Sequence, residues 1–205
     1  MDDANDEGYS GMTLMQHTPE DLAQEVRRLI DLLRSTGRTD LLLKAVSVPV
    51  LEELCMEAAK GRLSRLLITK SYQFILLDHE RQLVDLQPVH KAVYLLFLAH
   101  PEGIEFKCLS DHRDELRMWY RKVAPGLSPE KMEESINHLV NPLDNAINEK
   151  CSRIKRVFSD LLDEYTACYY IISGHAKKHV ASSNRIWFER RKIIILPRDL
   201  VVWEE

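Results

Sequence analysis

The spacing of apolar residues changes period along the chain, and this change limits the folds that the chain can adopt. Apolar residues first recur at helical spacing, but from Ser71 to Leu77 they lie at alternating positions of an extended segment. The polar run Asp78–Arg81 interrupts this segment, and an extended run then resumes as far as Leu86, which predicts a β-hairpin. Pro88 opens a strongly apolar helix directly afterwards. A chain that combines the two periods in this way is expected to be α+β.

The residues before the hairpin predict helices. Residues 1–17 are acidic and without periodicity, so we expect a disordered acidic leader. Thr18 then supplies an N-cap and Pro19 a first helical residue. The apolar positions that follow form a single stripe on this helix: Leu22, Val26, Leu29, Ile30 and Leu33. The stripe could join two copies of the chain as a homodimer through residues 18–68, although packing onto the chain's own domain is the simpler expectation.

A second helix is predicted from Pro49 to Lys60, where Gly61 supplies the residue past the helix end. We expect the N-terminal region, residues 18–70, to be helical to about Leu67. Beyond the hairpin, the pattern predicts a short strand and a series of helices: Ile104–Phe106, then Ser110–Val123, Pro129–Val140 and Asp144–Phe158. Segments rich in β-branched and aromatic residues predict the last strands: Tyr169–Ile172, Ile186–Phe188 and Ile193–Leu196. Residues 197–205 are expected to form a C-terminal tail.

The helix Asp144–Phe158 has two chemically different faces. Ile147, Cys151, Ile154 and Phe158 lie at offsets of four, seven and eleven residues, so they fall within about 60° of one another on a helix. They predict a buried stripe. The opposite face is polar and holds Asn145, Asn148, Glu149, Ser152 and Arg156, with Arg153 and Lys155 on its flanks. Any surface helix of this composition would expose such residues, but these types are also the ones that recognise base edges.

The order of elements resembles a winged helix-turn-helix, and in detail the output domain of OmpR/PhoB-type response regulators, a DNA-binding family. Three parts of the chain carry the resemblance. The first is the hairpin and apolar helix, Phe74–Leu77 with Gln82–Val89 and Leu95–Gly103. The second is Ser152–Arg156, where the family tends to have Ser-Arg-Leu-Arg-Arg in its recognition helix. The third is Tyr169–Gly174, where the family enters its wing.

The resemblance implies that residues 71–196 form a winged-helix domain preceded by a helical N-terminal extension. The recognition helix would place Asn145, Asn148, Glu149, Ser152 and Arg156 against base edges. Phosphate contacts would come from Arg153 and Lys155 on the helix and from a cationic wing tip with His175, Lys177 and Lys178. Charge agrees with this placement, because residues 150–192 hold ten basic and four acidic side chains whereas the whole chain has a net charge of −4. A solvated charged face would explain that charge equally well.

The chain also departs from this family. Only about 70 residues precede the hairpin, so the resemblance does not extend to a receiver domain or to activation by phosphorylation. Residues 124–143, which separate the two helices expected to form the helix-turn-helix, are longer than in the family and include a helix of their own. In the family this connection contacts RNA polymerase. We therefore expect either a docking surface for a protein partner there or an elaborated loop.

Several other functions are not indicated. The seven glycines form no phosphate-binding loop, and His112-Arg113-Asp114 matches a kinase catalytic loop only as a tripeptide, so we expect no enzyme and no cofactor. His175 and His179 are four residues apart on an expected loop with no third ligand nearby, which does not indicate a metal. The four cysteines form no Cys-x-x-Cys pair. An acidic start and the lack of a long apolar run predict a cytoplasmic protein without membrane contact.

The sequence therefore predicts a sequence-specific double-stranded DNA-binding protein that acts as a transcriptional regulator. The alternative is a degenerate winged helix that binds another protein. In that case the basic side chains of the helix and hairpin would be dispersed, or paired with Asp160, Asp163 and Glu164.

Overall fold

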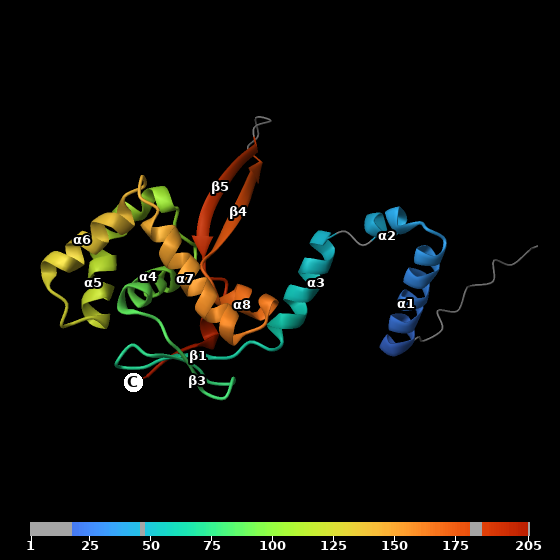
Figure 1. The fold of residues 1–205 in the computed structure, drawn as a ribbon, viewed down its shortest axis with the longest axis horizontal. Coiled ribbons are helices and arrows are strands. Elements are labelled where there is room, and N and C mark those ends of the chain that lie inside the picture. The colour runs from blue at the N-terminus through green and yellow to red at the C-terminus, as the bar shows by residue number, and fades with distance from the viewer. Residues whose placement is uncertain (1–17, 46–47, 181–185, 205) are drawn as a thin grey trace, which may run out of the picture. The chain divides into compact units, whose positions relative to one another are not determined.

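The structure is a computed structural model that describes residues 18–45, 48–180 and 186–204. The fold is α+β, and the chain divides into two compact units, Met1–Leu54 and Cys55–Glu205 (Figure 1). The predicted leader, residues 1–17, lies outside the described residues. No helix in the described ranges combines the length and the apolar character needed to cross a membrane.

The first helix begins where its capping residue predicts. Helix α1 (Pro19–Ser35) has a reciprocal cap, in which the Thr18 hydroxyl accepts from the Asp21 backbone N–H and the Asp21 carboxylate accepts from the Thr18 N–H. The helix ends before Gly37, which has a positive φ of 70°. A short α2 (Thr39–Ala45), which the sequence did not predict, precedes α3 (Val48–Lys60). Helix α3 matches the predicted helix and crosses the boundary between the two units.

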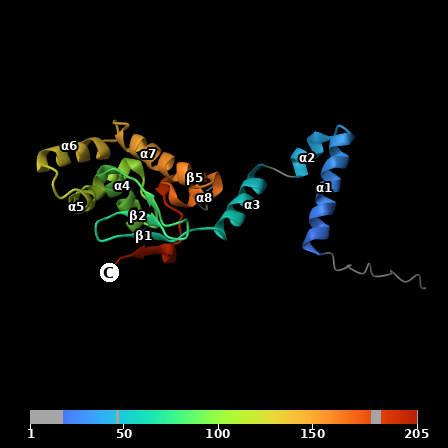
Figure 2. The same ribbon diagram turned by 60° about the horizontal axis from the view of Figure 1, so that its bottom comes forward.

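A four-stranded sheet lies on one side of the second unit's helices (Figure 2). Its strands are β1 (Leu66–Ile68), β2 (Phe74–Leu76), β3 (Gln82–Val84) and β6 (Val201–Trp203), in the order β3-β2-β1-β6. The predicted hairpin is confirmed as β2 and β3. Two expectations were wrong: Leu66 and Leu67 belong to a strand and not to a helix, and the C-terminal tail contains the strand that pairs in parallel with β1. Both strands have only three residues, too few to reveal a period in the sequence.

The helices of this unit surround α4 (Pro88–Ala99), which has eight buried residues and therefore forms the centre of the core. Helix α4 contacts α5 (Arg113–Val123) and α7 (Ala146–Leu161), and α6 (Pro129–Val140) contacts α5 and α7. Aromatic rings connect the sheet to the helices. The ring centroid of Tyr94 in α4 lies 5.5 Å from those of both Phe74 in β2 and Phe158 in α7. The bounds of the elements after α4 are η1 Phe106–His112, α5 Arg113–Val123, α6 Pro129–Val140, α7 Ala146–Leu161 and α8 Glu164–Tyr170.

A long hairpin of β4 (Ser173–Val180) and β5 (Ile186–Ile193) extends away from the helices (Figure 1). Its base is joined to the core by a bridge in which the Ile104 and Lys192 backbones each donate to the other at 2.9 Å. Gly103 permits this approach: its φ is 79°, and a Cβ there would lie 2.8 Å from the Lys192 carbonyl oxygen. The predicted strand Ile104–Phe106 is thus reduced to a single bridge. A 3-10 turn, η2 (Arg198–Leu200), then leads to β6.

Three predicted elements differ from those observed near the C-terminus. Tyr169 and Tyr170 belong to α8 and not to a strand, because Asp163 caps a helix there by accepting from the Thr166 N–H at 3.1 Å. The predicted strand Ile186–Phe188 is confirmed as part of β5, which pairs with β4 over eight residue pairs, whereas only Ile193 of the predicted strand Ile193–Leu196 belongs to it. The helix predicted to begin at Ser110 begins as η1 and becomes α-helical only at Arg113.

Candidate functional site

Helix α7 buries the stripe that its sequence predicts. Ile147, Ile154 and Phe158 are buried, and Cys151 is half-buried. Burial also raises the pKa of the Cys151 thiol to about 12, so this cysteine acts as an apolar core residue and not as a nucleophile. Burying each large apolar side chain contributes about 1.5–3 kcal/mol, which fixes which face of α7 points outward.

The opposite face of α7 is exposed along its whole length. Every residue that the sequence assigned to base or phosphate contact on this helix lies on it: Asn145, Asn148, Glu149, Ser152, Arg153, Lys155 and Arg156. The helix itself is α7 Ala146–Leu161, three residues longer at its C-terminus than the predicted Asp144–Phe158. Asn145 therefore sits at the N-cap, and its side-chain oxygen accepts from the Asn148 amide at 3.1 Å.

Positive charge dominates the middle of this face. Arg156 lies 3.9 Å from Asp160, but both side chains are about seven-tenths exposed, at 73% and 68%, so the pair is a weak one. No ion pair of Arg153 or Lys155 occurs among the residues that the structure describes. Burial lowers the pKa of His90 beneath α7, and the charges of Lys150 and Arg153 lower it further. The helix thus presents cations that are available to an anionic partner.

The hairpin holds the remaining predicted phosphate contacts, but not in the place expected. His175, Lys177 and Lys178 were expected at a wing tip, whereas their backbone belongs to strand β4, where they pair with Arg191, Glu189 and Phe188 of β5. The antiparallel register extends to Val180 because β5 supplies a partner for each residue, and residues 181–185 lie outside the described part of the chain. The positions of these three side chains are likewise outside the described part of the chain.

The connection between α6 and α7 is short. Five residues, 141–145, join the two helices, and Asp144 makes hydrogen bonds to residues on both sides of this connection. Its carboxylate accepts from the Ala146 N–H at 3.0 Å and lies 2.5 Å from Nδ1 of His138. The His138 interaction, followed by the backbone bond, lowers the pKa of Asp144. Residues 124–143, which connect α5 to the turn before α7, contain the helix α6, as the sequence predicts.

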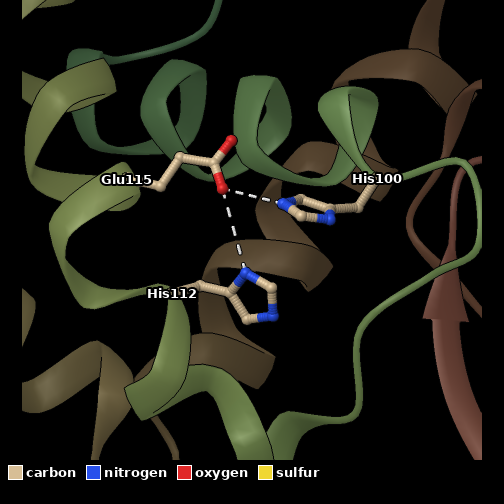
Figure 3. Close-up of side chains that lie close together, drawn as sticks. All are labelled: His100, His112 and Glu115. Atoms are coloured by element: carbon tan, nitrogen blue, oxygen red, sulfur yellow. Dashed lines mark hydrogen bonds and ion pairs between the residues drawn. The ribbon is translucent and has the colours of Figure 1, made fainter.

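A second cluster was not predicted from the sequence. His100 at the end of α4, His112 at the N-cap of α5 and Glu115 in its first turn point toward one another (Figure 3). Nε2 of His100 lies 2.7 Å, and Nδ1 of His112 3.8 Å, from Oε2 of Glu115. The spacing of His112 and Glu115 by three residues at a helix start was the available signal, but nothing in the sequence linked them to His100.

The cluster has further partners that fix its side chains. Glu102 lies 2.7 Å from Nδ1 of His100, and the indole N–H of Trp119 donates to Oε1 of Glu115 at 3.4 Å. Partial burial acts to lower the pKa of His100, but hydrogen bonds to Glu115 and Glu102 outweigh it, so this pKa is raised. The two imidazole rings meet edge to face, with centroids 4.5 Å apart.

The described surface thus offers two chemistries. A helix face provides amide, carboxylate and guanidinium groups to a large polar partner, and a compact cluster provides two imidazoles and one carboxylate. Comparison of the chain with protein-family models, with curated proteins and with solved structures found no match.

Proposed function

We propose that the chain binds double-stranded DNA in a sequence-specific manner through the exposed face of α7, and that it acts as a transcriptional regulator. One observation carries this proposal. All seven side chains of the predicted contact face are exposed, while the stripe on the other side of the same helix packs into the core. A recognition helix must be held by the domain on one face and present the other to the major groove.

The chemistry of the face suits a duplex. Helix α7 has 16 residues and is about 24 Å long, enough to cross a major groove about 12 Å wide. Arg156 can donate two hydrogen bonds to guanine, Asn148 can pair with adenine, and Glu149 can accept from cytosine. Arg153 and Lys155 lie on the flanks, where they can contact phosphates.

The surrounding elements support a winged-helix arrangement. Helix α6 precedes α7 through a short turn, and the β4–β5 hairpin follows it after α8. The hairpin is tied to the core at Ile104, so its base is fixed relative to α7 within the same unit.

A random-sequence DNA selection with the full-length protein, followed by gel shifts at 50 mM salt, tests this proposal. Arg156→Ala should weaken binding to the selected site by about 1–3 kcal/mol and relax the preference at one base position. Lys155→Ala should weaken binding to all DNA sequences alike. It should also reduce the slope of log affinity against log salt concentration by about 1. The matched control is Lys70→Ala, an exposed lysine between β1 and β2, which should leave both quantities unchanged. Absence of salt-dependent DNA affinity in the wild-type protein would refute the proposal.

A second candidate, binding of a protein partner, is favoured by the segment 124–143. Leu143, in the turn between α6 and α7, is 95% exposed, which is an unusual position for leucine. Ala124, Pro125, Leu127, Pro129 and Met132 line a surface hollow of about 350 Å³ together with Arg121. Leu143→Ser should weaken a protein complex without changing DNA affinity if this segment is a docking surface. Loss of DNA binding in that variant would instead place Leu143 in the DNA interface.

A further inference from the structure

We propose that His100, His112 and Glu115 form a binding site for one divalent transition-metal ion, with Zn²⁺ as the probe. The three ligand atoms, Nε2 of His100, Nδ1 of His112 and a carboxylate oxygen of Glu115, all lie within 4.8 Å of one another. Two imidazoles and one carboxylate are a ligand set that Zn²⁺ and Fe²⁺ both accept. This site is separate from the α7 face, so the inference stands or falls independently of DNA binding.

The observed distances suit an ion after small movements. Bonds of about 2.0–2.1 Å in a tetrahedral site place neighbouring ligand atoms roughly 3.3–3.4 Å apart. The shortest observed separation, 2.7 Å from His100 Nε2 to Glu115 Oε2, must widen, and the 3.8 Å separation of His112 Nδ1 from the same oxygen must shorten. Each change is within reach of side-chain torsions. The metal replaces the proton between Nε2 of His100 and Oε2 of Glu115.

The fold holds the three ligands on packed helices and not on a free loop. His100 is the C-cap of α4, whereas His112 and Glu115 occupy the N-cap and third positions of α5. Helices α4 and α5 pack against each other, and η1 lies in the segment that connects them. The three side chains converge from these two helix ends (Figure 3). Ligands on rigid elements lose little conformational entropy when the ion binds.

The neighbouring groups are placed as an outer shell would be. Glu102 lies 2.7 Å from Nδ1 of His100, which selects the tautomer whose Nε2 is free to bind a metal. The Trp119 indole N–H donates to Oε1 of Glu115, and the other carboxylate oxygen, Oε2, faces the imidazoles. A metal-ligating histidine almost always donates its second ring N–H to a carboxylate or carbonyl. A simple surface ion pair needs neither the second histidine nor this orientation.

Access to the site is adequate. The side chains of His100, His112 and Glu115 are 20%, 25% and 31% exposed, so an ion can enter from solvent while the ligands remain largely enclosed. Three protein ligands leave a fourth position for water or for an exogenous group. The proposed site therefore has an open coordination position, unlike a structural metal site in which protein ligands fill every position.

Titration of the full-length protein with Zn²⁺, followed by calorimetry and by tryptophan fluorescence, tests the site. The wild type should bind one ion at this cluster, and Trp119 should report it because its indole contacts Glu115. His112→Ala and Glu115→Gln should each weaken binding at least about tenfold, and Glu102→Gln should weaken it about 10- to 100-fold. The control is His138→Ala, which removes a histidine that pairs with the Asp144 carboxylate and that, among the described residues, belongs to no cluster of possible metal ligands.

Circular dichroism establishes that each variant remains folded, and Co²⁺ absorption gives a second measurement. The wild type should show the spectrum of a four- or five-coordinate Co²⁺ ion, and Glu115→Gln should lose it. Zn²⁺ binding that survives in the combined His100→Ala, His112→Ala, Glu115→Gln variant would place the ion elsewhere and overturn the proposal. Lack of saturable Zn²⁺ binding by the wild type would overturn it as well.

Discussion

Tyr170 is the residue that ties α8 to the start of the sheet. Its ring is fully buried and stacks on Phe158, with centroids 5.5 Å apart. Its hydroxyl donates to the Ser64 carbonyl at 2.6 Å and accepts from the Ser64 N–H at 2.7 Å. Burial raises the pKa of Tyr170 to about 12, so the hydroxyl keeps its proton. One side chain thus satisfies both backbone groups of a buried residue 106 positions away.

Tyr170→Phe should lower the free energy of unfolding by about 1–3 kcal/mol, because it leaves a buried N–H and a buried carbonyl of Ser64 without partners. Urea denaturation measures this. Tyr169→Phe is the matched control, since the Tyr169 hydroxyl makes a single bond, to the Met56 carbonyl at 2.9 Å. Its cost should be nearer 1 kcal/mol. Equal losses in the two variants would contradict the account of Tyr170.

At the scale of elements, charged side chains connect α5 with α6. Glu133 of α6 accepts from both Arg117 and Arg113 of α5, and Arg117 also contacts Asp114. The Arg117 guanidinium, more than that of Arg113, lowers the pKa of Glu133 from 4.5 to about 2. Helix α6 begins at a Ser128 cap and ends at Val140, as its sequence predicts, and these contacts join it to α5 beside the buried apolar residues of both helices.

A carboxyl group whose pKa is depressed in the folded state stabilises that state above its unfolded pKa. This stabilisation is lost as pH falls. For Glu133 the window runs from about pH 4.5 down to about 2. Glu133→Gln should therefore flatten the fall in melting temperature between pH 5 and pH 2, as measured by thermal scans. The exposed neighbour Glu134, changed to Gln, is the control and should follow the wild-type profile. If the melting temperature of Glu133→Gln fell with pH as steeply as that of the wild type, this role of the ion pairs would be excluded.

For the whole molecule, the sheet depends on segments from both ends of the second unit. Strand β1 pairs with β2 on one side and with β6, over 130 residues later in the chain, on the other. Trp203 of β6 also stacks on Trp119 of α5, with centroids 6.2 Å apart. Residues 66–68, which the sequence assigned to the N-terminal helical region, are therefore a central part of this unit.

Truncation tests this division of the chain. Deletion of residues 1–54 should leave a protein that unfolds cooperatively in urea, because the unit Cys55–Glu205 keeps all strands of its sheet. Deletion of residues 1–68 should abolish near-ultraviolet circular dichroism, because it removes β1 and exposes β2 and β6. Sedimentation of the first fragment also tests whether the half-exposed stripe of α1, which includes Leu22 and Leu29, joins two copies. Equal behaviour of the two fragments would contradict the placement of β1.

The candidate sites were predictable to different degrees. The α7 face followed from the sequence because an amphipathic helix of 16 residues repeats its pattern often enough to fix both faces. The histidine cluster did not follow, because His100 and His112 are brought together by the packing of α4 on α5. The basic residues of the hairpin were identified, but their assignment to a tip was wrong because strand pairing extends beyond them.

Local sequence signals were enough to locate the capped and strongly periodic helices, as Thr18, Pro88 and Ser128 demonstrate. These signals act within a few residues of the chain, so they survive without tertiary contacts. The short strands β1 and β6 and the convergence of His100, His112 and Glu115 arise only from tertiary contacts. Each of these depends on a partner distant in sequence, whose contribution no local pattern records.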